Sequence, residues 1–333
     1  MRFFLDEMPG ETRGIVVWDD KIHSLYIERD SDRPEHRLGS RVVGRIARIE
    51  PGIRAAFVDL GCGEPFGFMP LPKNQHLTEG SRLLVEVTAE PRESKGPVLK
   101  ALGDSDGDVG LVIAGPSVRQ IIQHMAGKEL PVTGHEAIEM SLQAEDDVLQ
   151  THVVNPEVGL DLSVQRTRAL IAADIDYAPL PGKDSRKGRE QVNRYGLNEV
   201  ARQLRLRHWA GTVVIDLAGV GFSGDAVLGT AKSAFAGFDQ VSFGPVSRFG
   251  LVQLSLPWRY RPLDERLAAG EAKPLSALRA LRRALLADTA TPFYDLVCGP
   301  ADSDFLTPLV GQLGPRARLR PDGAPGQYII REG

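Results

Sequence analysis

Two short apolar runs joined by a long basic segment constrain the fold of this chain more than any other feature. ALIAADID (residues 169–176) and GTVVIDL (residues 211–217) have the strongest patterns of buried strands in the sequence. The segment between them, REQVNRYGLNEVARQLRLRHW, has apolar residues near positions 192, 200 and 204, which predicts a helix with one packed face. A strand, a helix and a second strand in this order usually form a crossover unit with parallel neighbouring strands.

Three aspartates lie near the ends of these two runs. Side chains two positions apart on a strand share a face, so Asp174 and Asp176 project together, and Asp216 ends the neighbouring run. If the strands pair, three carboxylates meet, and their repulsion favours a bound cation with a preference for oxygen ligands, Mg²⁺ or Mn²⁺. The alternative interpretation is that these aspartates are solvent-exposed turn formers at the strand ends.

Basic residues crowd the segment between the two strands. From residue 183 to residue 207 eight basic side chains stand against three acidic ones, whereas the whole chain, with 40 Lys and Arg and 44 Asp and Glu, has a net charge of −4. Cations beside a carboxylate cluster suit a metal-dependent enzyme that acts on nucleic acid. The alternative is a solvated helix face. The basic residues are Lys183, Arg186, Lys187, Arg189, Arg194, Arg202, Arg205 and Arg207.

Residues 38 to about 100 have the sequence pattern of a small β-barrel. The short runs RVVGRIARI, IRAAFVDLG, FGFMPL and RLLVEVTAE are separated by turn signals, which predicts a closed β-barrel. Alternation in IRAAFVDLG puts Phe57 on the face opposite Val58 and Leu60, and Phe68 follows the next turn. Two rings on one face form a platform on which single-stranded bases stack. Packing inside the barrel core is the other interpretation of both rings.

The rest of the chain contains shorter signals. GIVVW and SLYI predict a hairpin within residues 1–37, and LGDSDGDVG (102–110) predicts a connection. GLVIAG and THVV are typical of strands, and VRQIIQHM and HEAIEMSLQAEDD of helices. PLDERLAAGEAKP (262–274) is interpreted as a linker to a small α/β appendage that has a helix at 275–287 and strands in FYDLVCG and QYIIRE.

Composition adds limits on compartment and size. The 333 residues are 42% hydrophobic and 25% charged, which is typical of globular proteins and indicates two domains at roughly 150 residues each. The sequence has no signal-like run and no stretch of about 18 apolar residues, so we expect no membrane span. Cys62 and Cys298 stand far apart without a second ligand at zinc spacing, which fits a reducing cytosol and excludes a cysteine-based zinc site.

Several of these motifs together resemble one family. RIARIEPGIRAAFVDLGCGEPFGFMPL resembles the RNA-binding OB-type barrel of the ribonuclease E/G family. RTRALIAADID, NEVARQLRLR, VVIDL and SRFGLVQLS resemble successive motifs of that family's catalytic region, in the same order, and the resemblance covers roughly residues 10–258. The family consists of bacterial Mg²⁺-dependent endoribonucleases that cut single-stranded, often AU-rich RNA.

The resemblance implies roles for individual residues. The family's catalytic aspartates fall on Asp174 and Asp216, and a metal-holding asparagine falls on Asp176, which is a departure. We therefore expect Asp174, Asp176 and Asp216 to be metal ligands. The family's stacking phenylalanines fall on Phe57 and Phe68, its basic barrel-loop residue on Lys95 and its SRFG arginine on Arg248. Together with residues of the basic segment, the expected RNA-binding residues are Phe57, Phe68, Lys95, Lys183, Arg186, Lys187, Arg202, Arg205 and Arg248.

The same resemblance implies an α/β (α+β) multidomain fold. An RNase H-like subdomain, formed by residues 1–37 and 110–160, is interrupted by an OB-fold RNA-binding barrel over residues 38–103. A catalytic α/β subdomain with the metal site follows at residues 161–262, and the small appendage occupies residues 263–333.

Two departures from the family shape the expected function. The family's 5′-sensing segment with its Arg-Thr pair and its Cys-x-x-Cys zinc link are both missing. We expect a cytoplasmic endoribonuclease that uses Mg²⁺, or alternatively Mn²⁺, but no zinc, and whose homodimer, if formed, has no zinc link. It cuts single-stranded mRNA or rRNA precursors regardless of their 5′ ends and leaves 5′-phosphate and 3′-hydroxyl ends. The alternatives are a non-catalytic RNA-binding protein, because of Asp176, and a scaffold whose tail binds a partner.

Overall fold

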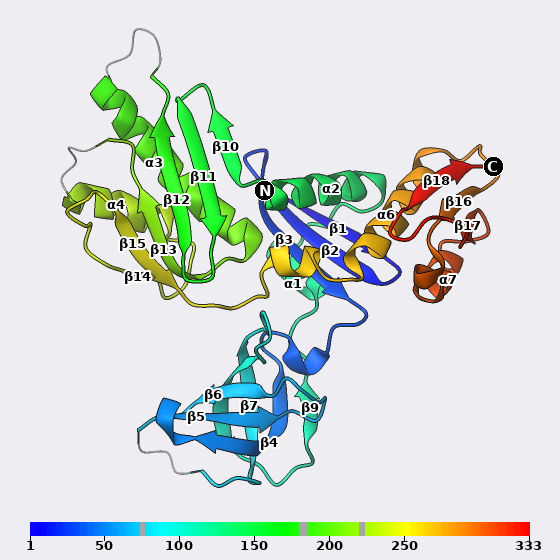
Figure 1. The fold of residues 1–333 in the computed structure, drawn as a ribbon, viewed down its shortest axis with the longest axis horizontal. Helices are drawn as coiled ribbons and strands as arrows, with labels where there is room; N and C mark the ends of the chain where they lie inside the picture. The colour runs from blue at the N-terminus through cyan, green and yellow to red at the C-terminus, as the bar shows by residue number, and fades with distance from the viewer. Residues whose placement is uncertain (74–76, 180–184, 220–223) are drawn as a thin grey trace. The chain divides into compact units, whose positions relative to one another are not determined.

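A computed structural model describes residues 1–73, 77–179, 185–219 and 224–333. The chain forms two compact units, one built from Met1–Glu145 and Leu263–Gly333 and the other from Asp146–Pro262. Mixed sheets, helices and a closed barrel give an α+β fold, as expected (Figure 1). No helix in the described ranges is long and apolar enough to cross a membrane.

The second unit is a six-stranded sheet with helices on one face. Its strands are β10 (His152–Asn155), β11 (Leu160–Arg166), β12 (Ile171–Tyr177), β13 (Gly211–Asp216), β14 (Ser242–Phe243) and β15 (Val252–Leu256), in the order β10-β11-β12-β13-β15-β14. The pairing of β12 with β13 is parallel and all other pairings are antiparallel. The predicted crossover is therefore confirmed, and α3 (Ser185–Arg207) forms it.

Alternation along the strands decides which face of this sheet is covered. Ile171, Ala173 and Ile175 are buried against apolar residues of α3, in the core shared with α4 (Gly224–Ala234). Helix α3 approaches β12 so closely that a Cβ on Gly196 would lie 2.8 Å from Ile175 side-chain carbons. The intervening residues, among them Asp174, are exposed on the opposite face. One side of the sheet is thus packed and the other is open to a ligand.

The predicted barrel is confirmed. Its strands are β4 (Arg41–Glu50), β5 (Ala55–Asp59), β6 (Gly67–Pro70), β7 (Arg82–Ala89) and β8 (Val98–Asp104), in the order β5-β6-β8-β7-β4, and pairing of β5 with β4 closes it. Val42, Ile46, Val58 and Val85 are among its buried core. Strand β9 (Gly110–Ile113) extends the barrel sheet by pairing with β4, although the expected barrel boundary was residue 103. Short 3-10 helices occupy Pro34–His36 and Pro51–Ile53.

The N-terminal sheet consists of three antiparallel strands, β1 (Arg2–Met8), β2 (Glu11–Trp18) and β3 (Lys21–Arg29). The predicted hairpin is β2–β3, and its turn residues Asp19 and Asp20 both have positive φ, 51° and 54°. Helix α1 (Val118–Ala126) packs on this sheet, and α2 (His135–Leu149) follows it. The units divide after Glu145, within α2, and β10 (His152–Asn155), which precedes the expected boundary at residue 160, pairs with the second unit's sheet.

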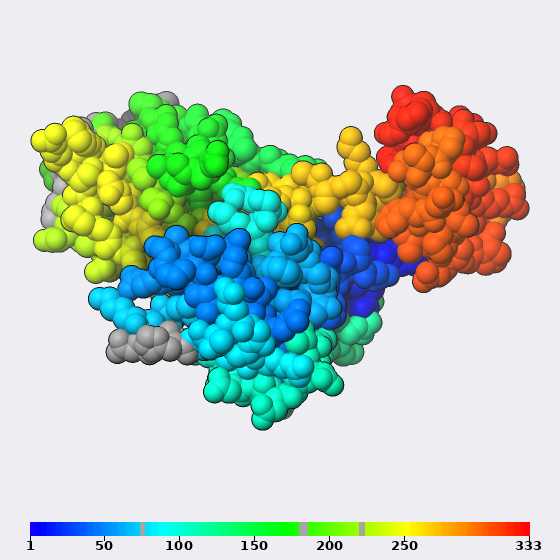
Figure 2. Space-filling view, turned by 60° about the horizontal axis from the view of Figure 1, so that its bottom comes forward, coloured from blue at the N-terminus to red at the C-terminus, as the bar shows by residue number. Residues whose placement is uncertain are grey.

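The appendage packs against the N-terminal sheet. It contains α5 (Leu263–Leu267), α6 (Ala272–Ala287), β16 (Tyr294–Val297), a 3-10 helix (Pro300–Asp302), α7 (Ser303–Gly311), β17 (Ala317–Arg320) and β18 (Ile329–Glu332). The interpretation of residues 262–274 as a linker was wrong, because α5 and the first turn of α6 lie there. Arg279 of α6 is fully buried and donates to Asp6 at 2.6 Å. In Figure 2 the orange atoms of the appendage accordingly lie against the dark blue atoms of the N-terminal strands.

Candidate functional site

Four aspartates share the open face of the second unit's sheet. Asp174 and Asp216 are directly opposite each other on the parallel strands β12 and β13, and Asp176 is opposite Asp161 on β11. All four side chains are exposed, whereas alternate strand residues such as Leu162, Ile175 and Ile215 are buried in the core that includes residues of the helices. Because paired strands lie about 4.8 Å apart, the carboxylates of Asp174 and Asp216 can approach one ligand. The strand pairing on which the predicted carboxylate cluster depends is therefore present.

The electrostatics of this face reflect the crowding of negative charge. Partial burial, and then the charges of Asp176, Asp216 and Asp161, raise the pKa of Asp174. A cation placed among the carboxylates would stabilise their ionised form. Within residues 1–73, 77–179, 185–219 and 224–333, no group of three or more His, Cys, Asp or Glu side chains is arranged to hold a metal ion. The donors are nevertheless all carboxylate oxygens, which suit Mg²⁺.

Asp161 did not appear among the predicted site residues. Its signal is present in the sequence, since the alternation of LDLSV puts Asp161 and Ser163 on the side opposite Leu160 and Leu162. The segment carries no strong apolar run of its own, and its partner strand cannot be read from the sequence. The antiparallel register of β11 with β12 is what brings Asp161 to Asp176.

The basic residues of α3 divide into two groups. Arg186 and Lys187, at the start of the helix, are exposed, and Arg186 forms an ion pair with Glu190 at 3.4 Å. Arg202 is buried and donates to Glu199 at 2.8 Å, and the Arg205 guanidinium lies 4.9 Å from the Phe238 ring centroid. The start of α3 therefore presents charge to solvent, whereas Arg202 and Arg205 have partners inside the protein. Lys183 lies outside the described residues.

Arg248 lies on an exposed turn before β15. Its guanidinium is 4.7 Å from the ring centroid of Phe249, a side chain that is 69% exposed. The Ser247 hydroxyl accepts hydrogen bonds from the backbone of Phe249 and Leu251 and so fixes the turn. Since Ile215 is opposite Val252, the turn lies at the end of the sheet where Asp216 ends β13.

The two predicted stacking rings form one cluster on the barrel. Phe57 and Phe68 are directly opposite each other on β5 and β6, half-buried, with ring centroids 6.0 Å apart and planes inclined by 70°. Val58 and Leu60 are buried, as the alternation predicts. The guanidinium of Arg48, which was not among the predicted site residues, lies 4.7 Å from the Phe57 ring centroid. The cluster combines aromatic surface with positive charge, a combination suited to nucleic acid.

Lys95 lies on the loop that packs against β6. The backbone N–H of Phe68 donates to the carbonyl of Pro97 at 2.7 Å, and a Cβ on Gly96 would lie 1.9 Å from the Phe66 carbonyl oxygen. Only glycine permits this approach, which holds the loop beside Phe68. The Lys95 side chain is exposed and its ammonium is 3.5 Å from Glu93. The structure thus brings Lys95 to the neighbourhood of the two rings.

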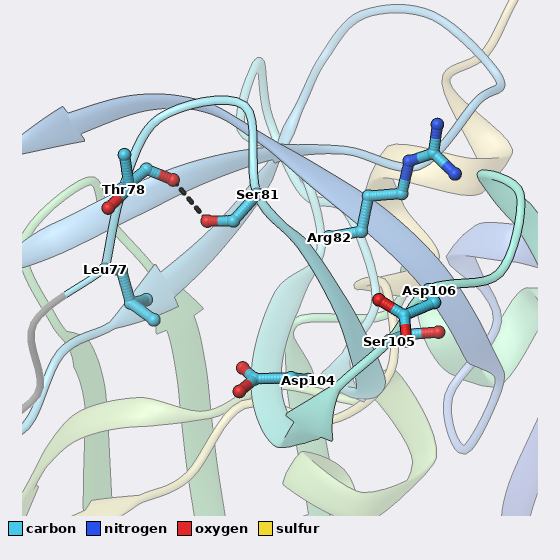
Figure 3. A pocket seen from close by; sticks show the side chains of 7 residues that line it. All are labelled: Leu77, Thr78, Ser81, Arg82, Asp104, Ser105 and Asp106. Carbon is cyan, nitrogen blue, oxygen red and sulfur yellow. Dashed lines mark hydrogen bonds between the residues drawn. The ribbon is translucent and has the colours of Figure 1, made fainter.

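One open concavity of about 500 Å³ lies elsewhere on the barrel (Figure 3). Its lining is polar and includes Arg82 and Asp104, at the start of β7 and the end of β8. None of the predicted site residues lines it. The four aspartates of the sheet are exposed and the two rings are half-buried, and accessible surfaces of this kind suit a polymeric ligand.

Part of the chain is similar to known proteins. Residues 112–257 match the model described as "Ribonuclease E/G family". Ribonuclease E of Buchnera aphidicola subsp. Schizaphis graminum is 34% identical over 107 residues, which cover 27% of this chain and 11% of that protein. Ribonuclease E of Escherichia coli K12 is 34% identical over 107 residues, 27% and 10% of the two chains, and that of Synechocystis sp. is 33% identical over 97 residues, 25% and 14%.

These matches cover a small share of each relative. The aligned segments span between 10% and 14% of the length of these three proteins. The matched region contains the Arg248 turn and the acidic face, which is the open sheet face with Asp161, Asp174, Asp176 and Asp216. The barrel with Phe57 and Phe68 precedes it. The resemblance predicted from the motifs is confirmed for residues 112–257.

Proposed function

We propose, from the ribonuclease E/G family region that this chain carries at residues 112–257, that the protein is a metal-dependent endoribonuclease acting on single-stranded RNA. The observation that carries the proposal is the register of β12 with β13, which puts Asp174 opposite Asp216 on the open face of the sheet. A nuclease site of this kind needs carboxylates that converge without being covered by the protein, so that the phosphodiester can reach them.

The donor set fits a hard divalent cation, Mg²⁺ or alternatively Mn²⁺. Asp174 and Asp216 would hold the ion, with Asp176 as a third carboxylate. Bound there, the ion would neutralise the carboxylates and activate water for attack on the phosphodiester, with 5′-phosphate and 3′-hydroxyl products. Asp176 stands where the family has asparagine and adds a negative charge. Zinc plays no part in this proposal.

The remaining residues bind RNA in the proposal. Arg186 and Lys187 would contact phosphates from the exposed start of α3, and Arg248 from the turn after β14. Phe57 and Phe68 would stack bases, with Lys95 holding the backbone beside them. Each stacked base contributes about 1–3 kcal/mol, so the rings supply affinity without sequence readout.

The proposal extends to the subdomain types, the cellular location, the substrate and the oligomeric state. The N-terminal sheet with α1 and α2 forms the RNase H-like subdomain, and the barrel is of the OB type. The enzyme acts in the cytoplasm on mRNA or rRNA precursors without regard to their 5′ ends. Any homodimer forms through protein contacts alone.

Charge removal at the two paired aspartates tests the proposal. Asp174→Asn and Asp216→Asn keep the shape but remove charge that balances the ion, so each should lower the cleavage rate by about 100-fold or more while RNA binding persists. The assay follows a labelled single-stranded RNA in Mg²⁺ and in EDTA. Asp108→Asn, an exposed aspartate before β9, is the matched control. Cleavage by Asp174→Asn at the wild-type rate would exclude Asp174 as a ligand.

RNA binding without cleavage is the second candidate function. The observation that favours it is the extra charge of Asp176, which stands where the family has an asparagine. The open face therefore carries four aspartates. In that case wild-type protein binds the labelled RNA and leaves it intact in Mg²⁺ and in Mn²⁺. The same assay therefore separates the two candidates.

A further inference from the structure

One row of side chains crosses four adjacent strands of the second unit's sheet. His152 of β10 is opposite Ser163 of β11, Ser163 is opposite Asp174 of β12, and Asp174 is opposite Asp216 of β13. Residues directly opposite each other in a sheet point to the same face. His152 therefore lies on the face of the aspartates, two strands from Asp174, which corresponds to about 10 Å at the usual strand spacing.

Asp161 holds the His152 ring in this position. The Nε2 atom of His152 is hydrogen-bonded to Oδ1 of Asp161, and the two residues lie diagonally across the β10–β11 pair. Both side chains are more than half exposed, so the His152 ring remains accessible to a ligand beside its contact with Asp161. An imidazolium has an N–H on each ring nitrogen, and it can therefore serve Asp161 and an external acceptor at once.

The charge on this face gives His152 its significance. Apart from it, the residues that strands β10 to β15 present on the open side are acidic, hydroxyl-bearing, amide or aliphatic. Among those strand residues His152 alone can carry a positive charge. An RNA strand laid across four carboxylates is repelled except where a cation meets a phosphate. His152 is placed to meet one on the β10 side of the aspartates.

We propose that His152, oriented by Asp161, binds an RNA phosphate that neighbours the cleaved one. The proposal rests on the endoribonuclease function proposed above and extends its substrate-binding surface to β10. His152 is a binding residue in this scheme and takes no part in bond breaking. A strand of RNA then runs along the row from β13 to β10, with its scissile phosphate at Asp174 and Asp216.

The first test compares steady-state kinetics of three variants. His152→Ala should raise KM for a short single-stranded RNA about tenfold and leave kcat little changed, because a charge-assisted hydrogen bond to substrate is lost. His152→Arg keeps a cationic donor and should restore KM to within about threefold of wild type. The matched control is His135→Ala, since His135 is also exposed and pairs with a carboxylate, Glu139, at 3.4 Å. An unchanged KM for His152→Ala overturns the proposal.

The second test locates the phosphate. A series of RNAs carries one neutral methylphosphonate each, at a different position in every RNA. Where the methylphosphonate replaces the phosphate that His152 binds, beside the cleaved bond, wild type and His152→Ala should have the same KM. If the KM ratio of the two proteins stays the same at every position, His152 contacts no phosphate and the proposal fails.

A third measurement does not depend on cleavage. In protein with ¹³C-labelled histidine, one of seven imidazole signals is assigned to His152 by its loss in His152→Gln. Adding the RNA in Mg²⁺ should shift this signal, and an RNA of the same sequence made wholly of methylphosphonates should not. If wild type fails to cut RNA but the signal shifts, the endoribonuclease proposal fails and phosphate binding at His152 stands. If cleavage occurs and the signal stays in place, the endoribonuclease proposal stands and phosphate binding at His152 fails.

Discussion

Asp176 gives the acidic face one more negative charge than the family pattern would. It lies opposite Asp161, and its charge is one of those that raise the pKa of Asp174. Asp176→Asn should therefore weaken cation binding, by about 1 kcal/mol or less because the site is open to water, which is up to about fivefold in affinity. Cleavage rates titrated with Mg²⁺ and with Mn²⁺ measure the shift. Identical titration curves for wild type and variant would show that Asp176 does not face the ion.

Glu11 is the centre of a buried charge network in the N-terminal sheet. Its carboxylate accepts hydrogen bonds from Arg13 and Arg29 at 2.7 Å and from Arg279 at 2.9 Å. Burial alone would raise the pKa of Glu11, but the three arginines outweigh burial and lower it from its ordinary 4.5 to about 2. The ion pairs of the charged Glu11 carboxylate therefore stabilise the folded state. This stabilisation is lost when the carboxylate takes up a proton.

The sign of the resulting pH dependence follows from linkage. Because the pKa is lower in the folded state, the stabilisation by Glu11 is complete above pH 4.5 and is lost progressively as the pH falls toward about 2. Glu11→Gln should lower the free energy of unfolding by on the order of 3 kcal/mol at pH 7, and by progressively less below pH 4.5. Denaturant unfolding at pH 7, 4 and 3 measures this. A difference that is equal at all three pH values would contradict it.

The strands of the barrel position Phe57 and Phe68 as a pair, and both rings are half-buried. Replacing both by Ala should reduce RNA affinity by several kcal/mol at most, at about 1–3 kcal/mol for each stacked base. Thermal stability should change little, because the edge-to-face contact itself is worth about 0.5–1.5 kcal/mol. Affinity is measured with a labelled single-stranded RNA, and Phe305→Ala, on α7, is the control. Unfolding of the double variant would show that the rings are core.

Elements with a strong apolar period were predictable from the sequence, and their partners were predictable only in part. Strands β12 and β13 and helix α3 lie where the apolar runs predict, because burial on one face dictates that pattern. The sequence predicts one RNA-binding surface from the basic segment, whereas helical geometry buries Arg202 beside Glu199 and exposes Arg186. His152 and Asp161 reach the site through antiparallel registers, which no local pattern encodes.

The C-terminal appendage illustrates the same limit. The sequence predicts a linker at residues 262–274. In the structure Arg266 of α5 is buried and donates to Asp32 at 2.8 Å, and Arg279 of α6 reaches Asp6 and Glu11. Arg266 and Arg279 thus pair with residues more than 200 positions earlier, a partnership that the sequence does not reveal.

Both ends of the chain thus belong to one unit, and the acidic face lies in the other unit, within the matched residues 112–257. Residues 1–145 and 263–333 form a unit whose N-terminal sheet and appendage share a network of buried charges. Breaking a buried ion pair by removing one partner typically costs about 3–5 kcal/mol. The appendage is therefore an integral part of this unit.

The course of the chain after the barrel determines how the proposed enzyme should respond to the RNA 5′ end. Strand β8 ends at Asp104, β9 begins at Gly110 and α1 begins at Val118, so the described chain has no separate domain between the barrel and the helices. The family resemblance implies that a 5′-sensing segment with an Arg-Thr pair would stand there. We therefore predict that the 5′-monophosphate is not specifically bound at this point of the chain.

Arg248 does not replace such a sensor in this scheme. Its guanidinium lies over the Phe249 ring on an exposed turn, and a screened surface contact with a phosphate is worth about 1 kcal/mol or less. Cleavage rates on matched RNAs with 5′-monophosphate, 5′-triphosphate and 5′-hydroxyl should therefore agree within about fivefold. Arg248→Ala should lower all three rates by a similar factor. A preference of tenfold or more for the monophosphate, about 1.4 kcal/mol, would show that another part of the chain recognises the 5′ end.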